Sequence, residues 1–177
     1  MTEQELKNER WDTLTDLITR HRVRSVIEIG SFMGESAIFF AGLVEQVTCI
    51  DPFEVPPENP WSRELAIRGV PNPYYDLFLS NIRAAGVEHK IKVLRGYSQH
   101  MANHAPQVDM VFIDGDHSYL GCALDIHDYI YKAAKVLCGD DFHCDENGNP
   151  YFPGVHQAVN KLLPGYSSKG LLWWLVK

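Results

Sequence analysis

The spacing of apolar residues predicts that helices and strands alternate along most of the chain. The N-terminal segment, residues 2–21, is charged except for apolar residues at helical intervals, which predicts an amphipathic helix. Six later runs are short and largely apolar, as buried strands of a parallel sheet are. The predicted strands are residues 25–30, 47–51, 91–97, 108–114, 136–141 and 171–176.

Helical periodicity returns between these strands. The predicted helices are residues 37–44, 73–85, 119–133 and 154–163. Ser118 is placed to cap the third of them, and Asn72 followed by Pro73 is typical of the start of the second. Such alternation predicts one α/β domain over residues 1–177, doubly wound around a mostly parallel sheet. Ligands of such sheets bind beyond the carboxyl ends of the strands.

Residues 52–73 interrupt the pattern with six prolines and Trp61. A loop of this length in a compact domain is usually a lid or a binding loop, and a short helix around residues 62–68 can interrupt it. We therefore divide the domain into an N-terminal helix (residues 1–22), a core (residues 23–177) and this proline-rich loop or lid. The N-terminal helix and the proline-rich loop are expected to form the pocket for a small-molecule ligand.

Composition and charge narrow the classes of function. The chain has 177 residues, 45% hydrophobic and 22% charged, as one globular domain does. Its net charge of −7 argues against a nucleic-acid partner, which a basic patch would indicate. We expect no membrane span and no signal peptide, because no apolar run is long enough and the N-terminus is polar. Four cysteines without a CxxC motif predict a reduced, cytoplasmic protein.

The turn after the first predicted strand carries the first candidate chemistry. Gly30 and Gly34 allow a tight turn and a close approach of a ligand to the backbone, whereas Phe32 stands where a dinucleotide fingerprint needs glycine. The Glu28 carboxylate can bind the α-ammonium group of S-adenosylmethionine. Asp51, at the end of the second strand, can accept hydrogen bonds from ribose hydroxyls. The simpler alternative is that these residues only connect secondary structure.

The chain resembles class I S-adenosylmethionine-dependent methyltransferases, specifically the group of macrocin-type sugar O-methyltransferases. The resemblance covers about residues 23–177 and rests on the motifs VIEIGSFMG, CIDPF, GYS, VDMVFIDGDHSYLGCALDI, GDDF and GVHQAV. It implies a Rossmann-like, seven-stranded sheet whose last strand is antiparallel. The residues implied at the cofactor are Glu28, Gly30, Ser31, Gly34 and Ser36 at the methionine end, Asp51 at the ribose, and Pro52, Phe53, Tyr97 and Ser98 at the adenine.

Carboxylates follow the fourth and fifth predicted strands, which are neighbours in the sheet order of that family. Clustered carboxylates repel one another, and a divalent cation such as Mg²⁺ relieves this repulsion. The resemblance implies Asp114, Asp140 and Asp141 as metal ligands, although the chain lacks the Pro-Gly-Gly-type turn that usually precedes the fifth strand. Without a metal, Asp114 would contact the cofactor or order its loop.

A metal-assisted reaction needs a base for the acceptor hydroxyl. His117, three residues after Asp114, has a suitable intrinsic pKa, and the resemblance implies the same role; His143 is the competitor. His117 can instead cap the following helix, and Asp116 can act only as a turn former. A zinc site is a further alternative, although its spacing fits no standard pattern. That alternative would use Cys138, Asp140, His143 and Cys144.

These features predict O-methylation of a small acceptor, sugar-like or catechol-like, with S-adenosylmethionine and Mg²⁺. Two alternatives stay open: an S-adenosylmethionine-binding protein without turnover, and a nicotinamide-dependent oxidoreductase, against which the missing GxGxxG motif argues. Trp173 and Trp174 point to opposite faces of the last strand, so one of them is a candidate contact in a homo-oligomer.

Overall fold

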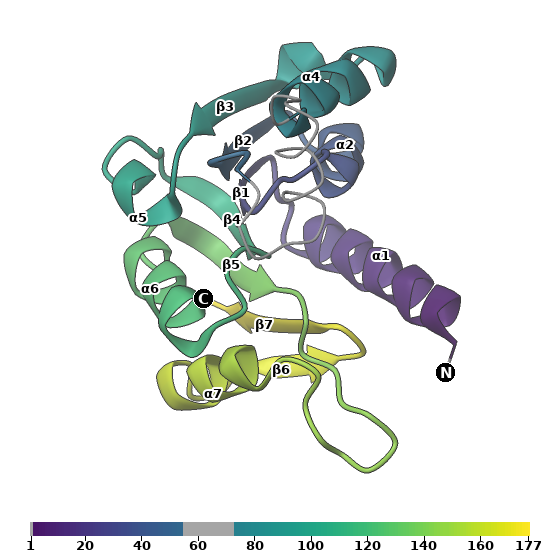
Figure 1. The fold of residues 1–177 in the computed structure, drawn as a ribbon, viewed down its shortest axis with the longest axis vertical. Coiled ribbons are helices and arrows are strands. Elements are labelled where there is room, and N and C mark those ends of the chain that lie inside the picture. Colours follow the sequence, from purple (N-terminus) through teal and green to yellow (C-terminus); the bar gives the residue numbers. More distant parts are fainter. Residues whose placement is uncertain (1, 55–72) are drawn as a thin grey trace, which may run out of the picture.

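The computed structural model describes residues 2–54 and 73–177 (Figure 1). One seven-stranded sheet has the order β3-β2-β1-β4-β5-β7-β6. Strands β1 to β5 pair in parallel, and β7 runs antiparallel to both of its neighbours, β5 and β6. The strands are β1 (Ser25–Ile29), β2 (Gln46–Asp51), β3 (Ile91–Arg95), β4 (Val108–Ile113), β5 (Ala133–Gly139), β6 (Ser167–Lys169) and β7 (Leu172–Val176). The predicted doubly wound, mostly parallel sheet with an antiparallel last strand is confirmed.

Helices cover both faces of the sheet. On one side lie α1 (Glu3–Arg20), α2 (Glu35–Leu43) and α4 (Tyr74–Ala84), and on the other α5 (Ser98–Met101), α6 (Tyr119–Tyr129) and α7 (Pro153–Leu162) (Figure 1). A short 3₁₀ helix, η1 (Glu88–Lys90), leads into β3. Helix α1 begins at a reciprocal cap: Thr2 Oγ1 accepts the Glu5 N–H, and the Glu5 carboxylate accepts the Thr2 N–H.

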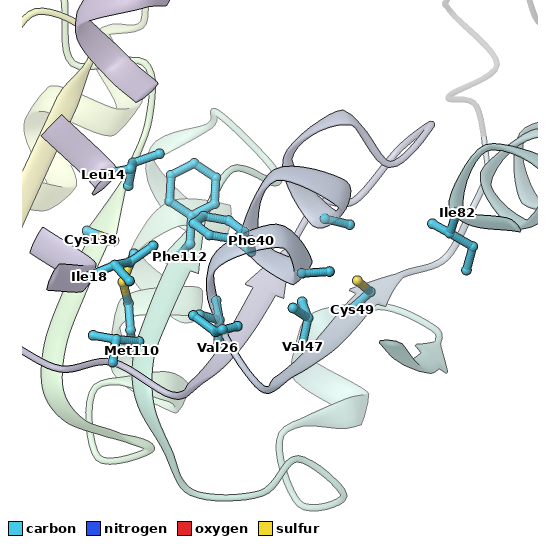
Figure 2. Packing of buried hydrophobic residues seen from close by; sticks show 14 of the residues in the cluster. Leu14, Ile18, Val26, Phe40, Val47, Cys49, Ile82, Met110, Phe112 and Cys138 are labelled. Carbon is cyan, nitrogen blue, oxygen red and sulfur yellow. The ribbon is translucent and has the colours of Figure 1, made fainter. Parts of the chain in front are cut away.

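Alternation along the strands divides the core into two layers. Val26, Val47, Met110 and Phe112 face α1 and α2, where they pack with Leu14 and Phe40 (Figure 2). Their neighbours Ile27, Ile50, Val111 and Ile113 face α6 and α7 instead. Because side chains alternate between the faces, Glu28 shares the face of Val26 and lies within the first apolar layer.

The structure corrects several predicted boundaries. Helix α6 ends at Tyr129 and Ala133 already pairs with Val108, so Ala133 belongs to the strand rather than to the helix. Pro73 is the cap residue of α4, not its first helical residue. Strand β3 ends at Arg95, because the chain turns at Gly96 to start the unpredicted helix α5. Trp61, Asn72 and the helix predicted at 62–68 lie outside the described residues, as does most of the proline-rich loop.

The two tryptophans of β7 have different surroundings. Trp173 is fully buried in the layer under α6 and α7, and the partly exposed Trp174 packs against the other layer. The homo-oligomer stays a prediction. In residues 2–54 and 73–177, no helix combines the length and the apolar character needed to cross a membrane.

Candidate active site

The carboxyl ends of the four central parallel strands lie side by side at one edge of the sheet. Ile29 at the end of β1 pairs with Ile50 of β2 and with Ile113 of β4, and Ile113 pairs with Gly139 of β5. The turns that follow these strands therefore start at one level. This register brings the predicted cofactor residues and the predicted metal ligands to a common edge.

Glu28 is a completely buried carboxylate at this edge. Its Oε2 accepts a hydrogen bond from the Cys49 thiol at 3.4 Å. Its Oε1 and the hydroxyl of Ser31 have no hydrogen-bond partner among the described residues. Burial raises the pKa of Glu28, and the hydroxyls of Ser31 and Ser36 oppose this rise. A buried acceptor left unpaired costs about 1–3 kcal/mol, so a ligand that brings a donor to Glu28 would remove this cost.

Two glycines shape the turn between β1 and α2. Gly30 has φ +88°, and a Cβ there would lie 2.0 Å from the carbonyl oxygen of Asp114, so the turn packs directly against the turn after β4. Gly34 has φ +91° and precedes the first residue of α2; a Cβ there would lie 3.1 Å from the Phe78 ring. Both positions therefore require glycine, and the first N–H groups of α2 remain without partners inside the helix.

Asp51 connects the turns after β1 and β2. Its Oδ2 accepts the Phe32 N–H at 2.9 Å and its Oδ1 accepts the Phe53 N–H at 2.5 Å. Both phenylalanines have positive φ, 44° and 53°, so two strained residues are held by one carboxylate. Each carboxylate oxygen keeps further acceptor capacity, which ribose hydroxyls can use.

The residues expected at the adenine have mixed environments. The Phe53 ring is buried against Tyr75 and Phe78, so this side chain belongs to the core. Tyr97 is half exposed and donates to Glu54 at 3.0 Å, whereas Ser98 is buried and donates its hydroxyl hydrogen bond to Asp125.

Asp114, His117 and Asp141 form an acid–histidine cluster. His117 Nε2 lies 2.6 Å from Asp141 Oδ2 and 3.7 Å from Asp114 Oδ1. One ligand atom from each residue lies within 4.8 Å of the others, and this is the only such group of His, Cys, Asp and Glu in the part of the chain that the structure describes. Asp141 has φ 63°, a left-handed conformation.

Charges within the cluster shift its titration. Burial, reinforced by the charges of Asp140 and Asp141, raises the pKa of Asp114 to about 7, while His117 opposes the rise. The carboxylates of Asp114 and Asp141 raise the pKa of His117 to about 10. His117 therefore carries a proton near neutral pH while both carboxylates are free of another cation.

Asp140 lies outside this cluster. Its Oδ2 accepts a hydrogen bond from Arg10 of α1, and the two side chains are 4% and 13% exposed. Arg10 also stacks over the ring of Trp11, 4.0 Å from the centroid. Two of the three expected metal ligands are thus brought together with His117, while the third is bound by a guanidinium group.

The other candidates have structural roles or lie apart. Asp116 accepts the Ser118 N–H at 2.8 Å and Ser118 caps α6 at Gly121, which supports the interpretation of Asp116 as a turn former. His143 stacks on Tyr151 with ring centroids 4.5 Å apart, and its buried Nδ1 has no partner among the described residues. His117 itself packs against Phe152, with 4.6 Å between ring centroids.

The cysteines form no metal site within the described residues. Cys138 is buried and donates to the Val111 carbonyl at 3.4 Å, and Cys144 is exposed on the loop between β5 and α7. Since Arg10 also binds Asp140, the zinc alternative finds no support.

Two functional candidates were missed by the sequence reasoning. Asp125 is 1% exposed, although it occurs among the apolar positions of α6, between Cys122 and Tyr129. A carboxylate at an apolar helical position is a readable signal, because burial of a charge needs a reason. Arg10 gave no comparable signal, since its partner Asp140 is 130 residues away.

Comparison with known proteins identifies the family to which the chain belongs. The family model described as "Methyltransferase domain" matches residues 27–138, whereas no curated protein sequence matches the chain. The fold is similar to that of an O-methyltransferase from Bacillus cereus solved with SAH, at 20% identity and a TM-score of 0.67, over 96% of this chain and 81% of that one.

Two further solved structures share the fold. TomG, an O-methyltransferase from Streptomyces achromogenes solved with SAM, has 17% identity and a TM-score of 0.65, over 96% of this chain and 80% of that one. The O-methyltransferase NovP has 15% identity and a TM-score of 0.71, over 97% and 79%. Because the family model spans more than half of the sequence, the chain belongs to the methyltransferase domain family and is a class I, S-adenosylmethionine-dependent methyltransferase.

Proposed function

We propose that this protein transfers the methyl group of S-adenosylmethionine to a hydroxyl of a small sugar-like or catechol-like acceptor, with the help of a divalent cation, taken as Mg²⁺. The observation that carries the proposal is the unpaired, buried Glu28 Oε1 and Ser31 hydroxyl, on the same sheet edge as Asp51 and the acid–histidine cluster. The family membership argues against the nicotinamide-dependent oxidoreductase.

The unpaired groups fit the methionine end of the cofactor. An α-ammonium group would supply the donor that Glu28 Oε1 lacks, and the Ser36 hydroxyl also interacts with this carboxylate. We assign Gly30 and Gly34, in the turn that follows Glu28, to the same end of the cofactor. Asp51 would accept hydrogen bonds from the ribose hydroxyls while it holds the turns at Phe32 and Phe53. We assign the adenine to Pro52, the Phe53 backbone, Tyr97 and Ser98.

The donor set of the acid–histidine cluster fits a hard divalent cation. Asp114 and Asp141 offer carboxylate oxygens to it, and relief of their mutual repulsion would favour binding. Asp140 joins this set only if Arg10 releases it. A bound cation would supply acidity to a hydroxyl of the acceptor, which makes that oxygen a better nucleophile near neutral pH.

We assign the base to His117, with His143 as the alternative. His117 Nε2 is the ring nitrogen that faces both carboxylates of the cluster. A cation bound to Asp114 and Asp141 would offset the charges that raise the pKa of His117, so the ring would be neutral and could take a proton from an acceptor held there. Asp114 and Asp141 orient this nitrogen, and Phe152 packs against the ring from the side of the β5–α7 loop. The remaining contribution of the chain is alignment, since displacement at a methyl carbon needs the attacking oxygen in line with the leaving sulfur.

The choice of an oxygen acceptor is supported by the three structural neighbours, each named as an O-methyltransferase. The test has two stages. Calorimetric titration with S-adenosylhomocysteine measures cofactor binding, and transfer of a radiolabelled methyl group to a panel of catechols and nucleotide-linked sugars measures turnover. We expect binding, and turnover that EDTA abolishes and Mg²⁺ restores.

The outcomes separate the alternatives. Binding without transfer to any hydroxyl compound would favour the S-adenosylmethionine-binding protein without turnover. Transfer that persists unchanged in EDTA would contradict the metal assistance while leaving the methyltransferase intact. Absence of any S-adenosylhomocysteine binding would contradict the assignment of Glu28 and Asp51.

A further inference from the structure

The geometry points to Asp125 as a positioning residue for the nucleoside end of the cofactor site, an inference that rests on the proposed function. Asp125 lies on α6, behind the turns that follow β3 and β4, and does not belong to the residues assigned to the cofactor. It is fully buried, and its Oδ1 accepts the hydroxyl hydrogen bond of Ser98. Through Ser98 it controls the turn that carries Tyr97.

Helix α6 holds this turn at two points. Tyr129, one helical turn after Asp125, is completely buried and donates its hydroxyl to the carbonyl oxygen of Ser98 at 2.7 Å. The side chain and the carbonyl of Ser98 are thus both bound by α6. Residues four apart on a helix lie on one face, so the two contacts act together.

The same carboxylate borders the turn after β4. A Cβ at Gly115 would lie 3.4 Å from Asp125 Oδ2 and 3.3 Å from Ile29 Cγ2, so the backbone of Gly115 lies between α6 and the end of β1. Asp125 therefore sets the separation between the Tyr97–Ser98 turn and the turn that starts at Asp114.

A role in stability alone would not need this arrangement. Burial raises the pKa of Asp125 to about 6, against the effect of the Ser98 hydrogen bond, so its ionised form is costly. An apolar side chain would fill the space without this cost, but it would leave the Ser98 hydroxyl unpaired and the turn free to shift.

Calorimetric titration of the full chain with S-adenosylhomocysteine and with 5′-methylthioadenosine, which lacks the amino-acid end, tests the inference. We expect Asp125→Ala to lower the affinity for both ligands by the same factor, about tenfold. This factor is equivalent to about 1.4 kcal/mol and is typical of one lost hydrogen bond. Asp125→Asn keeps an acceptor for Ser98 and should bind within about threefold of the wild type. The matched control Asp128→Asn changes the same charge on the same helix and should bind normally.

Tyr129→Phe is a second variant that tests the same inference if Asp125→Ala does not fold. It removes only the hydroxyl that binds the Ser98 carbonyl, and we expect weaker binding of both ligands. Unchanged affinity in both Asp125→Ala and Tyr129→Phe, or an equal loss in Asp128→Asn, would overturn the inference. Failure of the wild type to bind S-adenosylhomocysteine would instead contradict the proposed function itself.

Discussion

The ion pair between Arg10 and Asp140 gives the sharpest prediction on stability. Arg10→Met keeps most of the length of the side chain but removes the charge, which leaves a carboxylate that is 4% exposed without its partner. Breaking a buried pair from one side typically costs about 3–5 kcal/mol. The exposed Arg20, which pairs with Asp16 one turn away, is the matched control, and Arg20→Met should cost under about 0.5 kcal/mol.

Protonation of Asp140 sets an upper limit on this cost. Burial raises the pKa of Asp140 and Arg10 opposes the rise. Loss of the Arg10 charge in Arg10→Met therefore raises the pKa of Asp140 further and favours its neutral form. Protonation of an aspartate of ordinary pKa 3.8 costs about 1.36 kcal/mol for each pH unit above that value. The limit is therefore about 5 kcal/mol at pH 7.5 and about 3 kcal/mol at pH 6.0.

Urea unfolding followed by circular dichroism at both pH values measures the loss. We expect Arg10→Met to lose several kcal/mol at pH 7.5 and less at pH 6.0, and Asp140→Asn in the same chain to restore part of it. A loss equal to that of Arg20→Met would refute the reasoning. A loss at pH 6.0 clearly above the limit would show that Arg10 stabilises the fold through packing rather than charge.

Four further predictions concern the site. Asp51→Ala should lower the affinity for S-adenosylhomocysteine at least about tenfold in calorimetry, because the ribose hydroxyls lose a charged acceptor. Unchanged affinity would contradict the placement of the ribose. Asp141→Asn should lower turnover far more than cofactor affinity, and full activity of this variant in EDTA would exclude the metal mechanism. Gly30→Ala should fold poorly or lose cofactor binding, since its Cβ would lie 2.0 Å from a carbonyl oxygen; thermal denaturation checks this. The free energy of unfolding of Asp125→Asn should exceed that of the wild type by about 3 kcal/mol at pH 8 and by about 1 kcal/mol at pH 4.5. The reason is that the pKa of Asp125 is about 6 in the folded state and ordinarily 3.8, so the wild type loses stability as pH rises through that window. Equal free energies of unfolding at pH 8 would contradict this prediction.

The order of the elements could be predicted because each strand is a short apolar run that ends in a turn. The boundaries were harder where neighbouring patterns merge. Ala133 fits the apolar face of α6 and also the start of β5, and only its pairing with Val108 decides between them. All three residues of strand β6 are polar and exposed, so the strand carries no apolar signal, and only its pairing with β7 identifies it.

The candidate site was predictable to the extent that its residues follow strands. Asp114 and Asp141 meet because β4 and β5 are neighbours, and the family resemblance supplied that order. Adjacent positions in the chain did not reveal that Asp140 would bind Arg10, because this pairing depends on how α1 crosses the end of β5. The sequence pattern predicts which turn contains a residue, whereas tertiary packing determines which partner its side chain contacts.

The distribution of the four cysteines makes the chain easy to label. Burial raises the pKa of the thiols of Cys49, Cys122 and Cys138, so these remain protonated and unreactive toward maleimides. Cys144 alone is exposed, on the loop after β5 that also carries His143. The native chain can therefore carry a single fluorophore at Cys144, on the loop between β5 and α7, without mutagenesis.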